Sequence, residues 1–184
     1  MRFEVIDNFL TKEQWQAQYD LVFSTDFKWI YGRKNLEPES PFKSIIFQHW
    51  FHGDENLTAR DYDPRFISPA DKPDTSQLYW YTMCQPILDK FNVKKVMNIR
   101  TNLYTYWHET NNKEGTHIDH QTDEDYLTLI YYINGSDGAT WFEGQGNIEK
   151  IPNRIVIADG KIPHRCVYQT NTKAQIATNI NIIV

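Results

Sequence analysis

The chain has 184 residues and a mass of 21.9 kDa, which is enough for one buried core and too little for two ordinary domains. Hydrophobic residues make up 40% of the sequence and charged residues 23%, which excludes a disordered or fibrous protein. The formal net charge is -5 and the lysines and arginines are scattered, so a nucleic acid is a disfavoured partner.

The chain has only two cysteines, Cys84 and Cys166, which are far apart in the sequence. This argues against a disulfide framework and against a structural zinc site, and it favours a reducing, cytoplasmic location. Acidic residues occur early in the sequence, and the apolar runs are only a few residues long. We therefore expect no signal peptide and no membrane span.

The first predicted elements are a strand and a helix. Residues Phe3 to Asp7 form a short apolar and acidic run that predicts a strand. Thr11, followed three positions later by Gln14, resembles a capping box and predicts a helix that continues to about Phe23. We expect its apolar stripe to comprise Trp15, Tyr19, Val22 and Phe23.

Residues Gly32 to Pro73 contain five prolines and two glycines, which predicts loops with one strand at Ser44 to Trp50. This is the longest irregular stretch, and we expect it to form a rim or lid. A second helix is predicted from about Thr75 to Phe91, bent or shortened by Pro86. Its core-facing residues would be Leu78, Met83 and Leu88.

From Lys95 onward, short β-like runs alternate with turn signals. The predicted strands are Val96 to Tyr106, Leu127 to Ile133, Ala139 to Glu143, Arg154 to Ala158 and Gln175 to Val184. The breaks are at 111–115, 134–138 and 144–147. This spacing predicts a mainly β fold, a double-sheet jelly roll with N-terminal helices packed on one sheet. We expect a single domain, 1–184, with helical and loop-rich support over 1–95 and a catalytic core over 96–184.

A candidate metal site begins with His117 and Asp119, an H-x-D pair whose side chains would lie on the same face of an extended backbone. His164 follows Asp119 after three strand-like runs, so an antiparallel sandwich could return it to the same place. Two histidines and one carboxylate on one face of a metal are typical of non-heme Fe(II) oxygenases. His120 would point to the opposite face, which disfavours an H-x-x-H zinc site.

A polar and aromatic strand face precedes this pair. Arg100, Asn102, Tyr104 and Tyr106 would share one face if the backbone is extended, which predicts a lined pocket. On the last strand, the corresponding face would carry Lys173, Gln175, Ala177 and Asn179.

With these parts, the sequence resembles the prolyl 4-hydroxylase-like branch of the 2-oxoglutarate/Fe(II) oxygenases, including small phage and bacterial members. The resemblance covers residues 3–10 and nearly everything from Arg100 to the C-terminus. It consists of five elements in the family's order. They are the H-x-D pair, the strand Leu129 to Asn134, the G-x-T-x-F element Gly138 to Phe142, His164 and the basic residue Lys173.

The resemblance implies a double-stranded β-helix enzyme that uses Fe(II), 2-oxoglutarate and O2 to hydroxylate a C-H bond, with release of succinate and CO2. His117, Asp119 and His164 would hold the iron. Lys173 and Tyr132 would bind the distal carboxylate of 2-oxoglutarate, and Tyr104 or Tyr106 would also contact this co-substrate.

The sequence departs from the pattern at the basic residue. Many relatives use arginine for this contact, and some phage-type members carry a basic residue where Gln175 stands. Lysine supplies a point charge in place of a bidentate fork. Arg165, beside His164, is a further candidate.

Two other functions remain open. A non-catalytic, cupin-like jelly-roll module that binds a sugar or small ligand would also use many aromatic residues. A zinc hydrolase would use His117, His164 and either His120 or Asp119, but no paired general base supports it. Within the oxygenase interpretation, the substrate is a protein or peptide side chain or a small molecule. The sequence leaves the oligomeric state undetermined.

Overall fold

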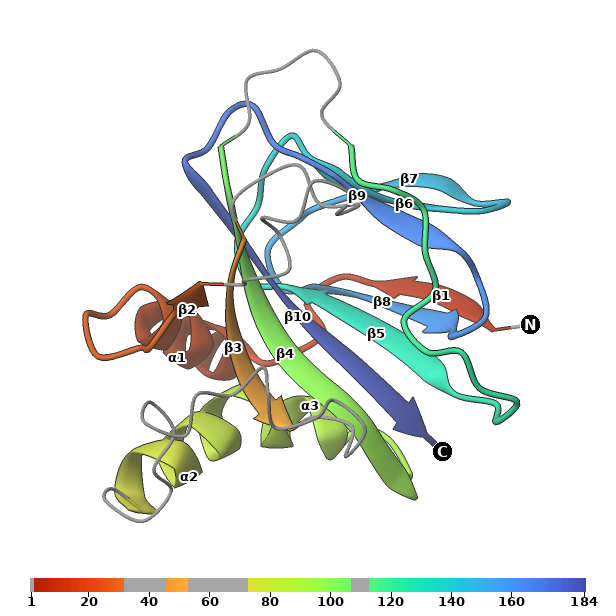
Figure 1. Cartoon of the computed structure of the whole chain (residues 1–184). Coiled ribbons are helices and arrows are strands. Elements are labelled where there is room, and N and C mark those ends of the chain that lie inside the picture. The colour runs from red at the N-terminus through yellow and green to blue at the C-terminus, as the bar shows by residue number, and fades with distance from the viewer. Residues whose placement is uncertain (1, 32–45, 53–72, 107–112) are drawn as a thin grey trace.

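The computed structural model describes residues 2–31, 46–52, 73–106 and 113–184 and shows two antiparallel β-sheets that face each other (Figure 1). The large sheet has the order β1-β8-β5-β10-β4-β3-β2, and the small sheet has the order β7-β6-β9. The strands of the large sheet are β1 (Phe3–Ile6), β2 (Ile30–Tyr31), β3 (Ile46–His52), β4 (Lys95–Thr105), β5 (Leu127–Tyr132), β8 (Arg154–Asp159) and β10 (Ala174–Ile183). Those of the small sheet are β6 (Ala139–Phe142), β7 (Gly146–Glu149) and β9 (His164–Val167).

Three helices cover the face of the large sheet that points away from the small sheet (Figure 1). They are α1 (Lys12–Val22), α2 (Pro73–Met83) and α3 (Gln85–Leu88). The helix α1 begins with the predicted capping box: Thr11 accepts from the backbone of Gln14, whose side chain accepts from the backbone of Thr11. The prediction of this helix is therefore confirmed at both ends.

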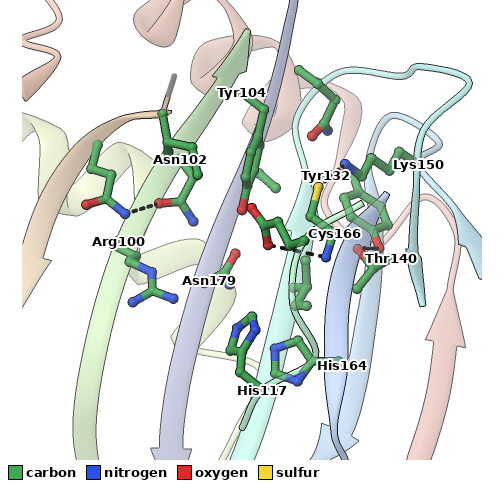
Figure 2. Close-up of a pocket in the computed structure, with 16 residues that line it drawn as sticks. Arg100, Asn102, Tyr104, His117, Tyr132, Thr140, Lys150, His164, Cys166 and Asn179 are labelled. Atoms are coloured by element: carbon green, nitrogen blue, oxygen red, sulfur yellow. Dashed lines mark hydrogen bonds between the residues drawn. The ribbon is translucent and has the colours of Figure 1, made fainter. Parts of the chain in front are cut away.

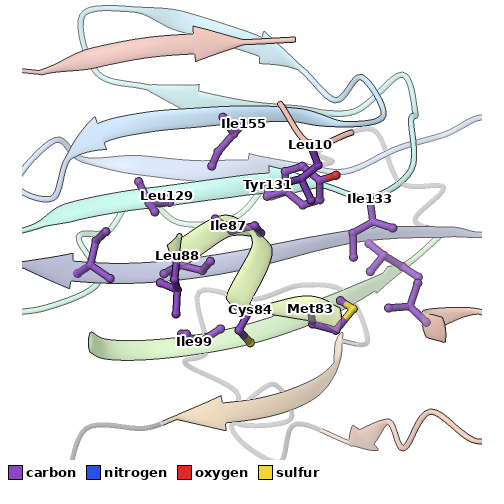
Figure 3. Packing of buried hydrophobic residues seen from close by; sticks show 14 of the residues in the cluster. Leu10, Met83, Cys84, Ile87, Leu88, Ile99, Leu129, Tyr131, Ile133 and Ile155 are labelled. Atoms are coloured by element: carbon purple, nitrogen blue, oxygen red, sulfur yellow. The ribbon is translucent and has the colours of Figure 1, made fainter. Parts of the chain in front are cut away.

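Alternation along the strands gives the large sheet two chemically different faces. Its outer face is apolar and packs under the helices, with Ile99, Leu129, Tyr131, Ile155 and Ile180 in one cluster with Met83, Cys84 and Ile87 (Figure 3). This burial is the main stabilising contribution to the fold. The inner face, which looks toward the small sheet, carries many polar residues, including Asn98, Asn102, Gln175 and Asn179. A polar face between two sheets predicts a site.

The jelly-roll prediction is confirmed, but individual residues differ from expectation. Phe23 and Leu78 are exposed, at 46% and 56% of their surface, although both were expected to face the core. Phe23 lies at the C-cap of α1, where its ring packs on Tyr19. The predicted second helix divides at Cys84 because Pro86 lies in the first turn of α3 and has no amide hydrogen to continue α2. Met83 and Leu88 are buried as predicted.

Three strands were missed by the sequence analysis: β2, β7 and β9. Residues Gly144 to Asn147 were expected to be a break, and the turn is there, with both glycines at positive φ, but β7 begins within it. The expected lid, between Gly32 and Pro73, lies largely outside the described residues, apart from β3 and Pro73. Within the described part of the chain, no helix is both long enough and apolar enough to cross a membrane.

Candidate metal centre

A pocket lies between the two sheets, and most of the residues that line it belong to strands of these sheets (Figure 2). The large sheet supplies Arg100, Asn102 and Tyr104 from β4, Ile130 and Tyr132 from β5, and Gln175, Ala177 and Asn179 from β10. The register explains this set, because Tyr104, Asn102 and Arg100 pair with Gln175, Ala177 and Asn179 across the β4–β10 ladder. The two strand faces predicted from alternation therefore lie side by side.

The two histidines are joined by their backbones. His117 and His164 exchange two N-H to carbonyl hydrogen bonds of 2.9 Å, and their ring centroids are 4.8 Å apart. This isolated antiparallel bridge places the segment that contains the H-x-D pair beside β9. The long separation in sequence is therefore closed by ordinary strand pairing.

Asp119 completes the group. One carboxylate oxygen, Oδ1, lies 4.0 Å from His117 Nε2, and the other, Oδ2, lies 3.7 Å from His164 Nε2. One ligand atom from each residue lies within 4.8 Å of the others. The Nδ1 atoms of His117 and His164 lie 3.1 and 3.2 Å from the carbonyl oxygens of Gly115 and Ile162. If each Nδ1 carries the proton, each ring presents Nε2 to a shared ion.

Two buried candidate ligand atoms, Asp119 Oδ2 and His164 Nε2, have no hydrogen-bond partner among the residues that the structure describes. Buried polar atoms in proteins are normally satisfied, because leaving one unpaired costs about 1–3 kcal/mol. A divalent cation would satisfy both. The donor set, two imidazoles and one carboxylate, fits Fe(II) with further coordination positions open.

The charge of Asp119 is maintained by a neighbouring cation. Burial alone would raise the pKa of Asp119, but Arg100 and then the two histidines lower it to about 2. Arg100 Nη2 donates to Asp119 Oδ1 over 3.2 Å, and its guanidinium lies over the ring of Trp50. The carboxylate is therefore ionised and ready to bind a metal across the physiological pH range.

Tyr126 holds the next part of the loop in place. Its hydroxyl donates to the carbonyl of Gly160 over 2.8 Å and accepts from the backbone N-H of His120 over 3.1 Å. A Cβ on Gly160 would lie 2.1 Å from the Tyr126 ring, so only glycine allows this close approach. The His120 side chain contacts Asn98 and lies outside the metal group. The loop is thus fixed directly after Asp119.

Of the four residues predicted as contacts of 2-oxoglutarate, two line the pocket and two do not. Tyr104 and Tyr132 are buried and line the pocket, whereas Tyr106 is 45% exposed and is not part of the lining. The Lys173 side chain is exposed and also lies outside the lining. Gln175, two residues further along in strand β10, lines the pocket instead.

Several lining residues were not anticipated from the sequence. They are Ile46, Gln48, Glu114, Thr140, Lys150 and Cys166. Thr140 and Cys166 are directly paired in the β6–β9 ladder, and a correct β6–β7 register would also have indicated Lys150. The predicted strand from Ser44 to Trp50 included Gln48, but nothing in the sequence indicated that its side chain would face a pocket. No sequence signal pointed to Glu114.

Two other residues considered as site candidates, Arg165 and His49, make packing contacts outside the pocket lining. Arg165 stacks on Trp141 and donates to Thr116, away from the pocket. The His49 ring packs among Phe27, Phe51 and Tyr79. His108 lies outside the described residues.

No family model matches the sequence, and no curated protein matches it in a sequence search. Solved structures, in contrast, match nearly the whole chain. A prolyl-4-hydroxylase of Pseudomonas putida matches with a TM-score of 0.59 and 12% identity, covering 98% of this chain and 91% of that one. The chain has the fold of the 2-oxoglutarate/Fe(II) oxygenases.

Two further oxygenase-fold structures are similar over the same 98% of this chain. A Trichoplax adhaerens prolyl hydroxylase, in complex with a hypoxia inducible factor peptide, has a TM-score of 0.57, 17% identity and 83% coverage of its own chain. HygX of Streptomyces hygroscopicus, with nickel and 2-oxoglutarate bound, has a TM-score of 0.52, 11% identity and 82% coverage. At these identities the likeness concerns the fold, and the function has to be argued from the site.

Proposed function

We propose that this protein is an Fe(II)- and 2-oxoglutarate-dependent dioxygenase that hydroxylates a C-H bond of a protein side chain or small molecule. The observation that carries the proposal is the convergence of His117, Asp119 and His164 at the pocket, where two buried atoms of this group find no hydrogen-bond partner in the described part of the chain. Surface histidines and aspartates that meet by chance would be solvated. The fold of the solved oxygenases supports the same function.

In this proposal His117, Asp119 and His164 bind Fe(II), and the iron, with 2-oxoglutarate and O2, supplies the oxidising chemistry. Arg100 keeps the Asp119 carboxylate charged and oriented. Phe142, whose ring stacks on His164 at 5.4 Å, gives the site an apolar wall that excludes water. Tyr104 and Tyr132 contact the co-substrate from the inner face of the large sheet.

The proposed substrate is a protein side chain or a small molecule, and a solved structure of similar fold supports each class. A similar fold in Trichoplax adhaerens is found in complex with a peptide, which supports a protein or peptide substrate. SnoN, an α-ketoglutarate-dependent epimerase from nogalamycin biosynthesis, matches with a TM-score of 0.53 and 12% identity. This likeness supports a small-molecule substrate. A reducing, cytoplasmic location agrees with two cysteines that are both free and buried.

The proposal is tested by adding Fe(II) and 2-oxoglutarate to the protein without oxygen and recording the visible spectrum. Chelation of iron by a keto acid is expected to produce a weak charge-transfer band, and admission of oxygen should then yield succinate. Asp119→Asn should lose the band, because the carboxylate ligand is gone. Asp123→Asn is the matched control, since Asp123 is exposed and outside the metal group.

A cupin-like binding module would give neither band nor succinate with the wild-type protein. A band that persists in the Asp119 variant would show that the iron is bound elsewhere.

A further inference from the structure

Lys150 is a buried lysine that faces the pocket. Only 2% of its surface is exposed, although lysine is almost never fully buried unless it is paired. Its ammonium donates to Cys166 Sγ over 3.0 Å and lies 5.1 Å from the centre of the Tyr104 ring. Figure 2 shows Lys150 with Tyr132 and Cys166 at one end of the pocket and the two histidines at the other.

Strand pairing sets the orientation of this side chain. Thr140 pairs with Ile148 in the β6–β7 ladder and with Cys166 in the β6–β9 ladder, so Lys150, two residues after Ile148, shares their inner face. The backbone is held on both sides, because Lys150 N-H donates to Gly138 and its carbonyl accepts from Ser136. The ammonium is therefore aimed into the pocket by the sheet.

The partners of Lys150 within the protein leave its charge poorly compensated. Burial raises the pKa of Cys166 to about 12, so its sulfur is a neutral thiol and a weak acceptor. Among the described residues, no carboxylate forms an ion pair with the ammonium. A buried ammonium with two spare donors favours an anionic ligand.

The strand that was expected to supply the cation does not present one to the pocket. On β10 the lining residues are Gln175, Ala177 and Asn179, all uncharged. Of the described lining residues, Arg100 and Lys150 carry the cationic groups, and Arg100 is paired with Asp119. Lys150 is thus the cation at the end away from the metal ligands.

Strand β9 indicates the distance between the metal-ligand end and the Lys150 end of the pocket. His164 and Cys166 are two residues apart on one face, about 7 Å along the strand. The pocket therefore presents metal ligands, then hydroxyls, then a cation. A short keto acid with a second carboxylate has its chelating group and its anionic group in the same order.

We infer that Lys150, on the small sheet, binds the distal carboxylate of the keto-diacid co-substrate, in the role that resemblance assigned to Lys173. The inference rests on the proposed function. The hydroxyls of Tyr132 and Thr140, which are hydrogen-bonded to each other at 2.8 Å, lie on the same side of the pocket and can complete the contact.

A buried carboxyl group, that of Glu114, lines the same pocket as Lys150. It accepts from Tyr168 over 2.9 Å. Burial raises the pKa of Glu114, while Tyr168, His117 and Lys150 act against this rise. The raised pKa favours the neutral form of Glu114, which does not repel an incoming carboxylate.

The test compares two ligands that differ only in the distal carboxylate: 2-oxoglutarate and 2-oxovalerate. Their dissociation constants are measured by calorimetry on the Mn(II)-loaded protein without oxygen. Wild-type protein should bind 2-oxoglutarate at least about tenfold more tightly. Lys150→Met should bring the ratio near one, Lys150→Arg should keep much of it, and Lys173→Met should leave it unchanged.

Each outcome separates the inference from the proposed function. If wild-type protein binds Mn(II) but neither keto acid, the proposed function fails. If Lys173→Met loses the preference and Lys150→Met keeps it, the resemblance was right and Lys150 has a structural role only.

Because Lys150→Met removes a buried charge, its folding is checked by thermal melting and circular dichroism. If it does not fold, Lys150→Gln decides the question, because its polar side chain can still donate to Cys166. Lys150→Gln should also bring the ratio near one, because the amide carries no charge, and a preference that stays as in wild type would overturn the inference.

Discussion

At the residue scale, the site depends on a small number of buried charges. Asp119, Glu114 and Lys150 are all nearly inaccessible, but they differ in how their charge is compensated. Asp119 has Arg100, which holds its pKa near 2. Within the described part of the chain, Glu114 accepts hydrogen bonds from Tyr168 and from the backbone of Cys166, and its pKa is raised by burial. One carboxylate is therefore kept ionised for a metal, whereas the other retains its proton more readily.

Glu114 gives a prediction for stability against pH. Because the folded-state pKa is raised above the value of 4.5, the native state holds this proton more tightly than the unfolded state. The contribution to stability is therefore present below pH 4.5 and is lost as the pH rises through the folded pKa. Glu114→Gln removes this loss.

Chemical denaturation of wild type and Glu114→Gln between pH 4 and pH 8 checks this. The free energy of unfolding of the variant, relative to wild type, should increase as the pH rises through the folded pKa of Glu114. Glu143→Gln, at an exposed position, should show no such slope. A flat difference for both variants would contradict the assigned shift.

At the element scale, the site is made where a loop is tied to strands. The β9 strand holds His164 and pairs with His117, and Tyr126 ties the residue after Asp119 to Gly160 at the end of β8. These contacts hold the three proposed metal ligands close together in the structure. Such preorganisation reduces the entropy that binding must overcome.

The substitution Tyr126→Phe tests this tie. It leaves the backbone N-H of His120 without its acceptor, which should cost about 1–3 kcal/mol of stability and weaken Mn(II) binding. Tyr131→Phe is the matched control, because Tyr131 is also buried and donates to Asn153, but on the outer face of the sheet.

Both variants are measured by denaturation and by Mn(II) titration with paramagnetic resonance. The control should lose stability and retain the metal affinity. Equal loss of affinity in the two variants would show that the tie acts only through global stability.

At the scale of the whole molecule, one sheet has two functions. Its outer face is packed under the helices and stabilises the fold, whereas its inner face is polar and lines the pocket (Figures 2 and 3). Unsatisfied atoms on the inner side reduce stability until a ligand binds. If the proposed site binds a metal, we expect this binding to stabilise the folded protein.

We expect Mn(II) at about 100 times its dissociation constant to stabilise the protein by about 2.7 kcal/mol. The shift in melting temperature should be reversed by a chelator. It should be absent in Asp119→Asn and present in Asp123→Asn. A shift of the same size in all three proteins would indicate nonspecific ion binding.

Sequence patterns were sufficient for the parts of the molecule that depend on local chemistry. The capping box fixed the start of α1, and turn residues and alternation located five of the strands in the β-rich part. The H-x-D pair and His164 were recognisable because metal ligands are chemically restricted, and the structure brings them together. The short strands β2, β7 and β9 escaped prediction, and β7 did so because it begins with the glycine and asparagine of a turn signal.

What only the tertiary structure decided is which residues share the pocket across the two sheets. Alternation shows which face a side chain takes, but it does not show where a strand passes out of the pocket, so Lys173 and Gln175 were equivalent until the β4–β10 register and the position of the second sheet were known. Lys150 had no local signal, because its pocket-facing position comes from the pairing of β7 with β6. Ligand chemistry is encoded in residue types, whereas the cation at the far end of the pocket depends on how separate strands pack.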